Sequence, residues 1–369
     1  MTTPVPDSLI NTWGMALLAA ACPHCGWSYL LPPGSLPLLC PHCCQDTLEE
    51  QTGAEIASLQ PPELIIPPTL SQEKVAHSVK QFAADIWFAP QDLRPQNLHQ
   101  RLRLLYLPLW LVDSDVQAQW QAQAGFNYQV VSHQERYAGN QWRTQEVQET
   151  KVRWEPRLGR LNRRYHNVTA PALDEHKILQ QRVGQYDLQA GKGYRPDAAA
   201  NALIRLPNRS PQDAWPDAEP HFQQRASGDC RTACKADHIR DFRWSSRYGN
   251  QHWTQLLTPV YVSHYFDDER QPHPLFINGQ TGQVSGRRRA SFKKASLYAV
   301  GIGLLALGLF LVGLVAAIVG LALGGVPAVI GGGIMLLALM LGIMALAPLF
   351  ITWRFNRAEK QKQGDWQSH

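Results

Sequence analysis

The chain has 369 residues and a formal charge of +5, from 35 lysines and arginines against 30 aspartates and glutamates. Residues 287–369 contain nine of the basic residues and two of the acidic ones, which leaves 26 basic and 28 acidic residues in 1–286. The basic excess therefore belongs to the C-terminal segment, and the overall charge does not argue for a nucleic-acid-binding protein.

Residues 1–50 are predicted to form a zinc ribbon. The sequence CPHC occurs at 22–25 and again at 40–43, with fourteen residues between the two copies. Each CxxC turn directs two thiolates to one point, and a tetrahedral shell of four thiolates selects zinc. One structural Zn²⁺ per chain is therefore expected on Cys22, Cys25, Cys40 and Cys43.

A signal peptide is the competing interpretation of the N-terminus. Met15–Ala21 is short and apolar and precedes Cys22, as in a lipoprotein cleavage site. Residues 1–14 contain no lysine or arginine, however, whereas a signal peptide needs a basic region before its apolar segment. We therefore expect this segment to belong to the ribbon. Cys44 is a further thiol beside the predicted site.

Residues 51–70 contain two Pro-Pro pairs and are predicted to form an extended linker. An amphipathic helix is expected after it, with Ser71 as the N-cap and Pro90 beyond its end. The apolar face of this helix consists of Val75, Val79, Phe82 and Ile86.

Residues 71–286 are predicted to form one cytoplasmic α+β domain with an antiparallel sheet. Apolar or alternating segments predict strands at 102–112, 116–131, 142–155, 160–168, 256–266 and 275–277. Hairpin turns are expected at Gly139-Asn140 and Asn278-Gly279. Residues 208–220, rich in proline and aspartate, are predicted to form a loop, and residues 221–242 a helix.

A basic stretch within this domain suggests an anionic partner. Its basic residues are Lys151, Arg153, Arg157, Arg160, Arg163 and Arg164. Trp154 and Tyr165 are interleaved with them, a mixture that can contact phosphates and stack on bases. Anionic lipid headgroups are a second candidate partner. The alternative is a solvent-exposed face of a hairpin with no partner.

A second group of metal-compatible residues falls in the predicted helix 221–242. Cys230, Cys234, His238 and Asp241 are spaced so that they would lie on one helical face. A second metal site is one interpretation. Small cysteines buried in the core are the other, because Phe222, Ala226 and Ala233 share roughly that side.

No charged residue lies between Ser296 and Arg354. Gly324-Gly325-Val326-Pro327 divides this stretch into two halves, each longer than the about 20 residues that a membrane-spanning helix needs. Residues 295–353 are therefore predicted to form a transmembrane helical hairpin, between a basic juxtamembrane segment at 287–294 and a polar tail at 354–369. Small residues within the hairpin would allow close packing and homo-oligomers.

The positions of the basic residues predict the orientation of the hairpin. Arginines and lysines flank it on both sides, and its central loop carries no charge. Positive residues stay on the cytoplasmic side, so both termini are expected in the cytoplasm. The reducing cytoplasm favours metal binding or burial over disulfides for the seven cysteines.

The sequence contains no HExxH, GxSxG or phosphate-binding GxxxxGK[ST] motif, so we expect no enzymatic activity. The arrangement resembles bacterial membrane proteins with an N-terminal TFIIB-type zinc ribbon, which are often labelled primosomal or replication-restart helicase-like. The resemblance rests on the two CPHC segments, Tyr106–Asp113, Pro259–Tyr261 and Phe276–Gly286. It implies cysteine-ligated zinc and association with the bacterial inner membrane, without an established activity.

We therefore predict a non-enzymatic adaptor or scaffold that docks a cytoplasmic protein at the inner membrane. A membrane-tethered nucleic-acid-binding protein, using the ribbon and residues 151–164, is the alternative. A membrane enzyme with an unrecognised site is the third interpretation.

Overall fold

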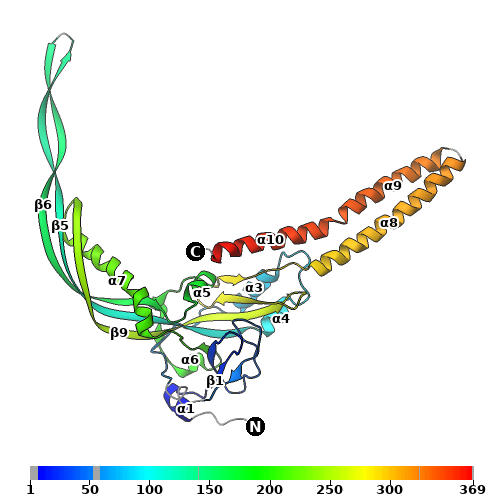
Figure 1. Ribbon diagram of the computed structural model, residues 1–369, viewed down its shortest axis with the longest axis horizontal. Coiled ribbons are helices and arrows are strands. Elements are labelled where there is room, and N and C mark those ends of the chain that lie inside the picture. The colour runs from blue at the N-terminus through cyan, green and yellow to red at the C-terminus, as the bar shows by residue number, and fades with distance from the viewer. Residues whose placement is uncertain (1–6, 53–58, 140, 324, 368–369) are drawn as a thin grey trace. The chain divides into compact units, whose positions relative to one another are not determined.

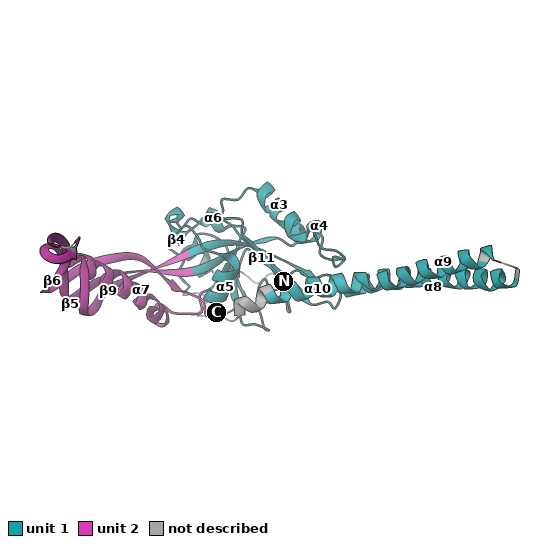
Figure 2. Cartoon of the chain, turned by 90° about the horizontal axis from the view of Figure 1, so that it is seen from above, with its two compact units in different colours: residues 1–108, 175–206, 257–369 teal, residues 109–174, 207–256 magenta. Residues whose placement is uncertain are grey.

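The computed structural model describes residues 7–52, 59–139, 141–323 and 325–367. The chain forms two compact units (Figure 2). Unit 1 contains residues 1–108, 175–206 and 257–369, and unit 2 contains residues 109–174 and 207–256. Strands β5 (Arg103–Ala138) and β9 (His238–Phe266) contribute residues to both units.

The N-terminal part of unit 1 is a small ribbon that joins the central sheet. β1 (Leu18–Ala21) pairs antiparallel with β2 (Ser28–Leu31) and with β3 (Glu49–Glu50). β2 also pairs with β8 (Leu203–Arg205), which lies parallel to the first part of β5. Buried side chains on these strands and on α1 (Asp7–Trp13) form one core cluster; they include Trp13, Leu30, Tyr106 and Ile204. The cysteine segment is therefore anchored to the main sheet of unit 1.

The opposite edge of the sheet in unit 1 is formed by β9, β10 (Pro272–Asn278) and β11 (Val284–Gly286). Two helices pack there, α3 (Gln72–Ala83) and α4 (Pro95–Gln100). The predicted amphipathic helix is confirmed in α3, because the Ser71 side chain accepts a hydrogen bond from the Lys74 N–H and Val75, Val79 and Phe82 are buried. The helix ends at Ala83, before Pro90, since Asp85 and Phe88 adopt positive φ angles.

Short elements complete unit 1. They are β4 (Leu64–Ile65), α5 (His176–Val183), the 3-10 turn Leu188–Ala190, β7 (Lys192–Gly193) and α6 (Pro196–Ala199). β4 pairs with β7, so part of the proline-rich segment joins the sheet. The predicted turn at Asn278-Gly279 is present. The Asn278 side chain accepts the N–H groups of Gln280 and Thr281, which fixes the chain between β10 and β11.

Unit 2 is built on a long antiparallel hairpin of β5 and β6 (Gln141–Pro171), shown in Figure 1. The two strands stay in register from Ser114 to Ala138, after one irregularity between Val112 and Ser114. The sequence analysis predicted two strands in each arm of this hairpin, separated at residues 113–115 and at residues 156–159. These breaks are wrong, because each arm is one continuous strand. The irregularity bends β5 without ending it, as a β-bulge does. The predicted turn residue Asn140 lies outside the described residues.

Helix α7 (Pro211–Ala233) packs on β6 and corrects two further predictions. Residues 211–220 are helical and not a loop. The predicted helix 221–242 is confirmed only for residues 221–233, and its last residues, 238–242, form the start of β9. Ser210 and Asp213 form a capping box that begins the helix. Pro216 and Pro220 lie inside it. The residues of α7 that are buried in the core of unit 2 recur every fourth position, at Ala214, Ala218, Phe222, Ala226 and Cys230. This packing outweighs the loss of helix stability that the two internal prolines cause.

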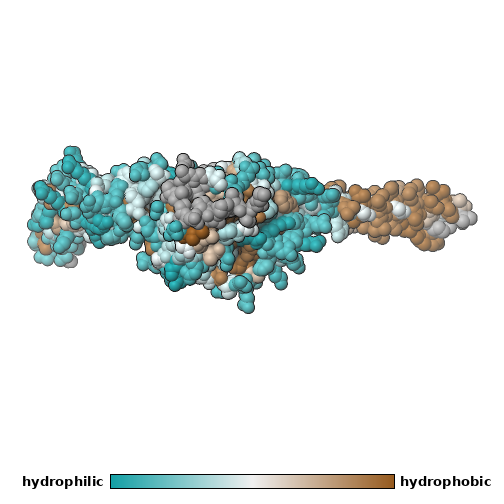
Figure 3. All heavy atoms as spheres, turned by 90° about the horizontal axis from the view of Figure 1, so that it is seen from below, coloured by the Kyte–Doolittle hydropathy of each residue, from teal (hydrophilic) through white to brown (hydrophobic). Residues whose placement is uncertain are grey.

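Three helices form the C-terminal part of unit 1: α8 (Phe292–Leu323), α9 (Val326–Met344) and α10 (Ala347–Gln367). Two helical segments are long and apolar enough to cross a membrane, Phe292–Ala322 and Ala328–Gln361. Most of their side chains are exposed, and apolar residues cover this surface in Figure 3. The sequence-based prediction of two apolar helices is confirmed.

Candidate metal centre

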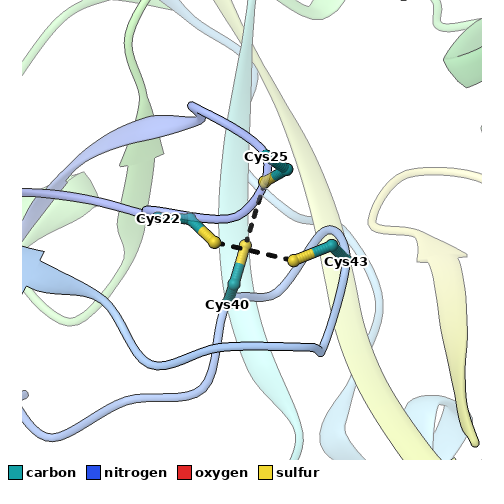
Figure 4. A group of neighbouring side chains, drawn as sticks. All are labelled: Cys22, Cys25, Cys40 and Cys43. Atoms are coloured by element: carbon teal, nitrogen blue, oxygen red, sulfur yellow. Dashed lines mark hydrogen bonds between the residues drawn. The ribbon is translucent and has the colours of Figure 1, made fainter.

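The four predicted ligand cysteines lie together in unit 1 (Figure 4). Cys22 and Cys25 follow β1, and Cys40 and Cys43 precede β3. The sulfur of Cys22 lies 3.6 Å from that of Cys43, and the sulfur of Cys25 lies 3.7 Å from that of Cys40. All four sulfurs lie within 4.8 Å of one another. This cluster could bind a metal ion.

The backbone of each CxxC segment folds into the same kind of turn. The Gly26 N–H donates to the Cys22 carbonyl at 2.9 Å, and the Cys44 N–H donates to the Cys40 carbonyl at 3.0 Å. The residue after each second cysteine has a positive φ, +71° for Gly26 and +52° for Cys44. Both turns therefore aim their two cysteines to the same side.

The cluster is partly buried, and this changes the acidity of its thiols. Burial raises the pKa of Cys25 and of Cys40, because a bare thiolate loses its hydration there. Burial would also raise the pKa of Cys22, but N–H groups of Cys25 and His24 point at its sulfur and bring its pKa below the usual value. A bound cation would stabilise the thiolates that burial alone disfavours.

Arg205 supplies a buried positive charge beside the cluster. It is 2% exposed, and its guanidinium donates to the carbonyls of Ser28 and Leu206 at 3.0 and 2.8 Å. The guanidinium also lies over the Trp27 ring, 4.6 Å from its centroid. Burial lowers the pKa of Arg205, and interactions with Tyr29, Glu175, Cys25 and Cys40 oppose this effect. Arg205 therefore offsets part of the negative charge that four thiolates would carry.

Aromatic residues enclose the same side of the cluster. The Trp27 and His42 rings stack with centroids 3.7 Å apart. Burial lowers the pKa of His42 to about 4, so its imidazole is neutral at pH 7. The Tyr29 hydroxyl lies 3.7 Å from the Cys40 sulfur. The Trp27 N–H donates to Glu175 at 3.1 Å. Of the four cysteines, Cys22 and Cys40 are buried and Cys25 and Cys43 are partly buried.

Sequence reasoning identified the cysteines but missed Arg205 and Glu175. Both lie more than 130 positions beyond Cys43 in the sequence, and no local pattern connects them to it. The pairing of β2 with β8 brings Arg205 to the site. Cys44 is buried next to the cluster, and burial raises its pKa to about 12. It is not among the four clustered sulfurs.

The second predicted metal group does not come together. Cys230 and Cys234 are buried at the end of α7, where they pack with Ala118, Trp120 and Ala122. His238 begins β9, is exposed and contacts Asn127, and Asp241 is exposed with a positive φ. In the described part of the chain, the N-terminal cysteines are the one group with metal-binding geometry. The expectation of one helical face was wrong because α7 ends at Ala233.

The six basic residues of the stretch 151–164 lie on β6 in unit 2. Because side chains alternate along a strand, Lys151, Arg153, Arg157 and Arg163 point to one face and Arg160 and Arg164 to the other. Four of them pair with carboxylates: Arg153 and Arg157 with Glu155, Arg163 with Asp229, and Arg164 with Asp115. The structure therefore divides this group between two faces, and the three carboxylates offset half of its six positive charges.

Comparison of the chain with protein-family models, with curated proteins and with solved structures finds no match in any of the three.

Proposed function

We propose that this protein is a non-enzymatic adaptor, anchored in the bacterial inner membrane by its apolar helices, that docks a cytoplasmic protein. The observation that carries this proposal is the cluster of four cysteine sulfurs in the turns next to β1 and β3 of unit 1. A metal held by all four would have no open position for a substrate, so the site would be structural. The proposal places the chain with the membrane proteins whose N-terminal TFIIB-type zinc ribbon it resembles.

Zinc is the metal that this donor set favours. Four sulfurs at the usual zinc–sulfur distance of about 2.3 Å form a tetrahedron with edges of about 3.8 Å. The two closest sulfur pairs in the cluster are 3.6 and 3.7 Å apart. The cation would tie the two CxxC turns together and so stabilise a segment with little core of its own.

Exposed aromatic residues in unit 2 support a protein partner. Tyr137 and Trp142 pair across β5 and β6, with ring centroids 5.3 Å apart, and are 56% and 68% exposed. Tyr128 is exposed on the same hairpin. Tyrosine and tryptophan are enriched in protein–protein interfaces, where they contribute much of the binding energy. We assign the partner-binding surface to this aromatic pair.

Capture from native membranes in mild detergent tests the proposal. The tagged full-length protein is compared with Tyr137→Ser/Trp142→Ser and with Cys22→Ala/Cys25→Ala, and co-purified protein and nucleic acid are both identified. We expect one protein to be recovered reproducibly with the wild type and lost with the aromatic variant. The control is Leu158→Ser, which changes a residue of the same hairpin that is 85% exposed.

Three outcomes would contradict the adaptor hypothesis. One is recovery of nucleic acid without a specific protein, which would favour the nucleic-acid-binding alternative. Another is equal recovery of the partner with the aromatic variant and the wild type. The third is release of the chain from membranes by alkaline carbonate, which would exclude insertion of the helices.

A further inference from the structure

Unit 1 contains a cavity of about 970 Å³ beside the start of α8 and the second half of α10. Its walls come from α3, α5, β10, β11, residues 287–289 and α10. Apolar side chains such as Phe82, Ile178 and Phe276 form part of the lining. The remainder is mainly polar or charged, so the cavity can take a ligand with both kinds of surface.

The charged side chains of the lining are predominantly basic. The basic ones are Arg182, Arg287, Arg288, Arg289 and Lys360, against the acids Glu269 and Glu359. Five positive and two negative charges leave a formal charge of +3. His273 adds none near neutral pH, because burial lowers its pKa. The lining therefore favours an anion.

Two of the arginines are already neutralised within unit 1. Arg288 pairs with Glu359 at 3.1 Å, and Arg289 pairs with Asp267 at 3.0 Å. Arg182 and Arg287 form no ion pair with any carboxylate in the described ranges. Arg182 lies over the Phe276 ring, 5.9 Å from its centroid. Both guanidinium groups are half-buried, and burial lowers the pKa of each; at Arg287 the carboxylate of Asp267, which already pairs with Arg289, partly opposes this effect.

The cavity is fixed to the ends of the apolar helices. Arg289 precedes Phe292, the first residue of one candidate span, by three positions, or at most about 11 Å of chain. The other candidate span ends at Gln361, next to Lys360. The Asn356 side chain on α10 exchanges two hydrogen bonds with the backbone of Ala290, at 2.8 and 3.0 Å. If the helices cross a bilayer, the cavity lies at the depth of its phosphate groups.

We propose that this cavity binds the phosphate group of an anionic phospholipid, with Arg182 and Arg287 as its direct ligands. Arginine is suited to this role because its planar fork can donate two hydrogen bonds to one phosphate. The apolar wall accommodates the first carbons of an acyl chain of the lipid. The assignment rests on the membrane insertion in the proposed function, and it is independent of the docking of a protein partner.

Lipid titration of the full-length protein tests the assignment. The protein is reconstituted in bilayer discs of phosphatidylcholine alone or mixed with phosphatidylglycerol, and phosphatidylglycerol retained per chain after re-extraction is measured by mass spectrometry. The variants are Arg182→Gln, Arg287→Gln and the double substitution. Lys293→Gln/Arg354→Gln is the matched control, because it removes two exposed basic residues that flank the helices but do not line the cavity.

We expect the wild type and the control to retain phosphatidylglycerol, and the double variant to bind it at least about tenfold more weakly. If the double variant and the control lose equal amounts of phosphatidylglycerol, the assignment is overturned. General attraction between basic residues and anionic lipids would then explain the retention. Retention of no phosphatidylglycerol by the wild type would also overturn it. Arg182→Gln alone is expected to reduce binding, which gives a test if the double variant misfolds.

A soluble phosphate ester has the same recognition chemistry as a lipid headgroup. Glycerol 1-phosphate is therefore titrated against lipid-free protein in neutral detergent, with thermal unfolding as the measurement. Stabilisation by it that is lost in the double variant, together with no phosphatidylglycerol retained by the wild type, would reassign the cavity to a soluble ligand and overturn the lipid assignment. Extraction with alkaline carbonate distinguishes a failure of the lipid assignment from a failure of the proposed function. If only the lipid assignment fails, the double variant stays inserted in the membrane.

Discussion

Gly26 and Cys44 occupy equivalent positions in the two CxxC turns. Each follows the second cysteine of its turn, each has a positive φ, and each N–H donates to the carbonyl of the first cysteine. Glycine adopts this conformation at little cost, whereas another residue loses about 1 kcal/mol or more. The turn therefore requires the backbone conformation of Cys44 and does not use its buried thiol.

This equivalence predicts that Cys44→Gly keeps the metal and Cys43→Ser does not. Glycine satisfies the left-handed backbone at position 44, and the four clustered sulfurs are unchanged. The Cys43→Ser change removes one of them. Metal per chain, measured by inductively coupled plasma mass spectrometry, is expected to stay at one in Cys44→Gly. A drop in that variant would mean that Cys44 is a ligand.

Replacing Arg205 by methionine is expected to loosen metal binding. The change removes the buried cation beside the thiolates and two hydrogen bonds to backbone carbonyls. Removing a residue that supports metal ligands typically costs 10- to 100-fold in affinity, so release to a chelator should accelerate by about that factor. Arg195→Met is the control, because the Arg195 side chain is 74% exposed. Equal release rates in both variants would exclude a role for Arg205 at the site.

The helical hairpin is expected to tolerate a side chain at Gly332 but not at Gly331. A Cβ at Gly331 would lie 2.4 Å from the backbone nitrogen of Ala317 on α8, whereas nothing lies within 4 Å of one at Gly332. Gly331→Val should therefore destabilise the hairpin by about 1–3 kcal/mol, because two backbones must separate. Thermal unfolding in mild detergent compares the two valine variants. Equal midpoints would contradict this packing.

Acidification is expected to destabilise unit 1 through His264. Burial lowers the pKa of His264 to about 4, and the nearby Arg101 adds to the effect. The unfolded chain, with an ordinary histidine pKa near 6.5, binds the proton first. Stability therefore falls as the pH drops from about 6.5 to 4, by at most about 1.4 kcal/mol per pH unit. His264→Gln should make this dependence less steep in unfolding experiments, and the part that comes from His42 and His273 should remain. His77→Gln, at an exposed residue of α3, should leave it unchanged.

Local sequence patterns were sufficient where the structure depends on near neighbours. The CxxC turns bring their ligands together within a few residues, Ser71 caps α3, and the uncharged stretch after Ser296 forms apolar helices. Residues 221–233 of α7 were predicted as helix, but residues 211–220 were not, because Pro216 and Pro220 locally oppose a helix and the packing of Ala214, Ala218 and Phe222 within unit 2 overrides them. Arg205 reaches the cysteines only through the pairing of β2 with β8.

X-ray absorption at the zinc edge, on full-length protein purified in mild detergent, tests the central claim most directly. A closed structural site predicts one zinc per chain with four sulfur ligands at about 2.3 Å. A shell with three sulfur ligands and a water oxygen in place of the fourth would contradict this account. It would leave a position open for a substrate, and it would favour an enzyme over an adaptor.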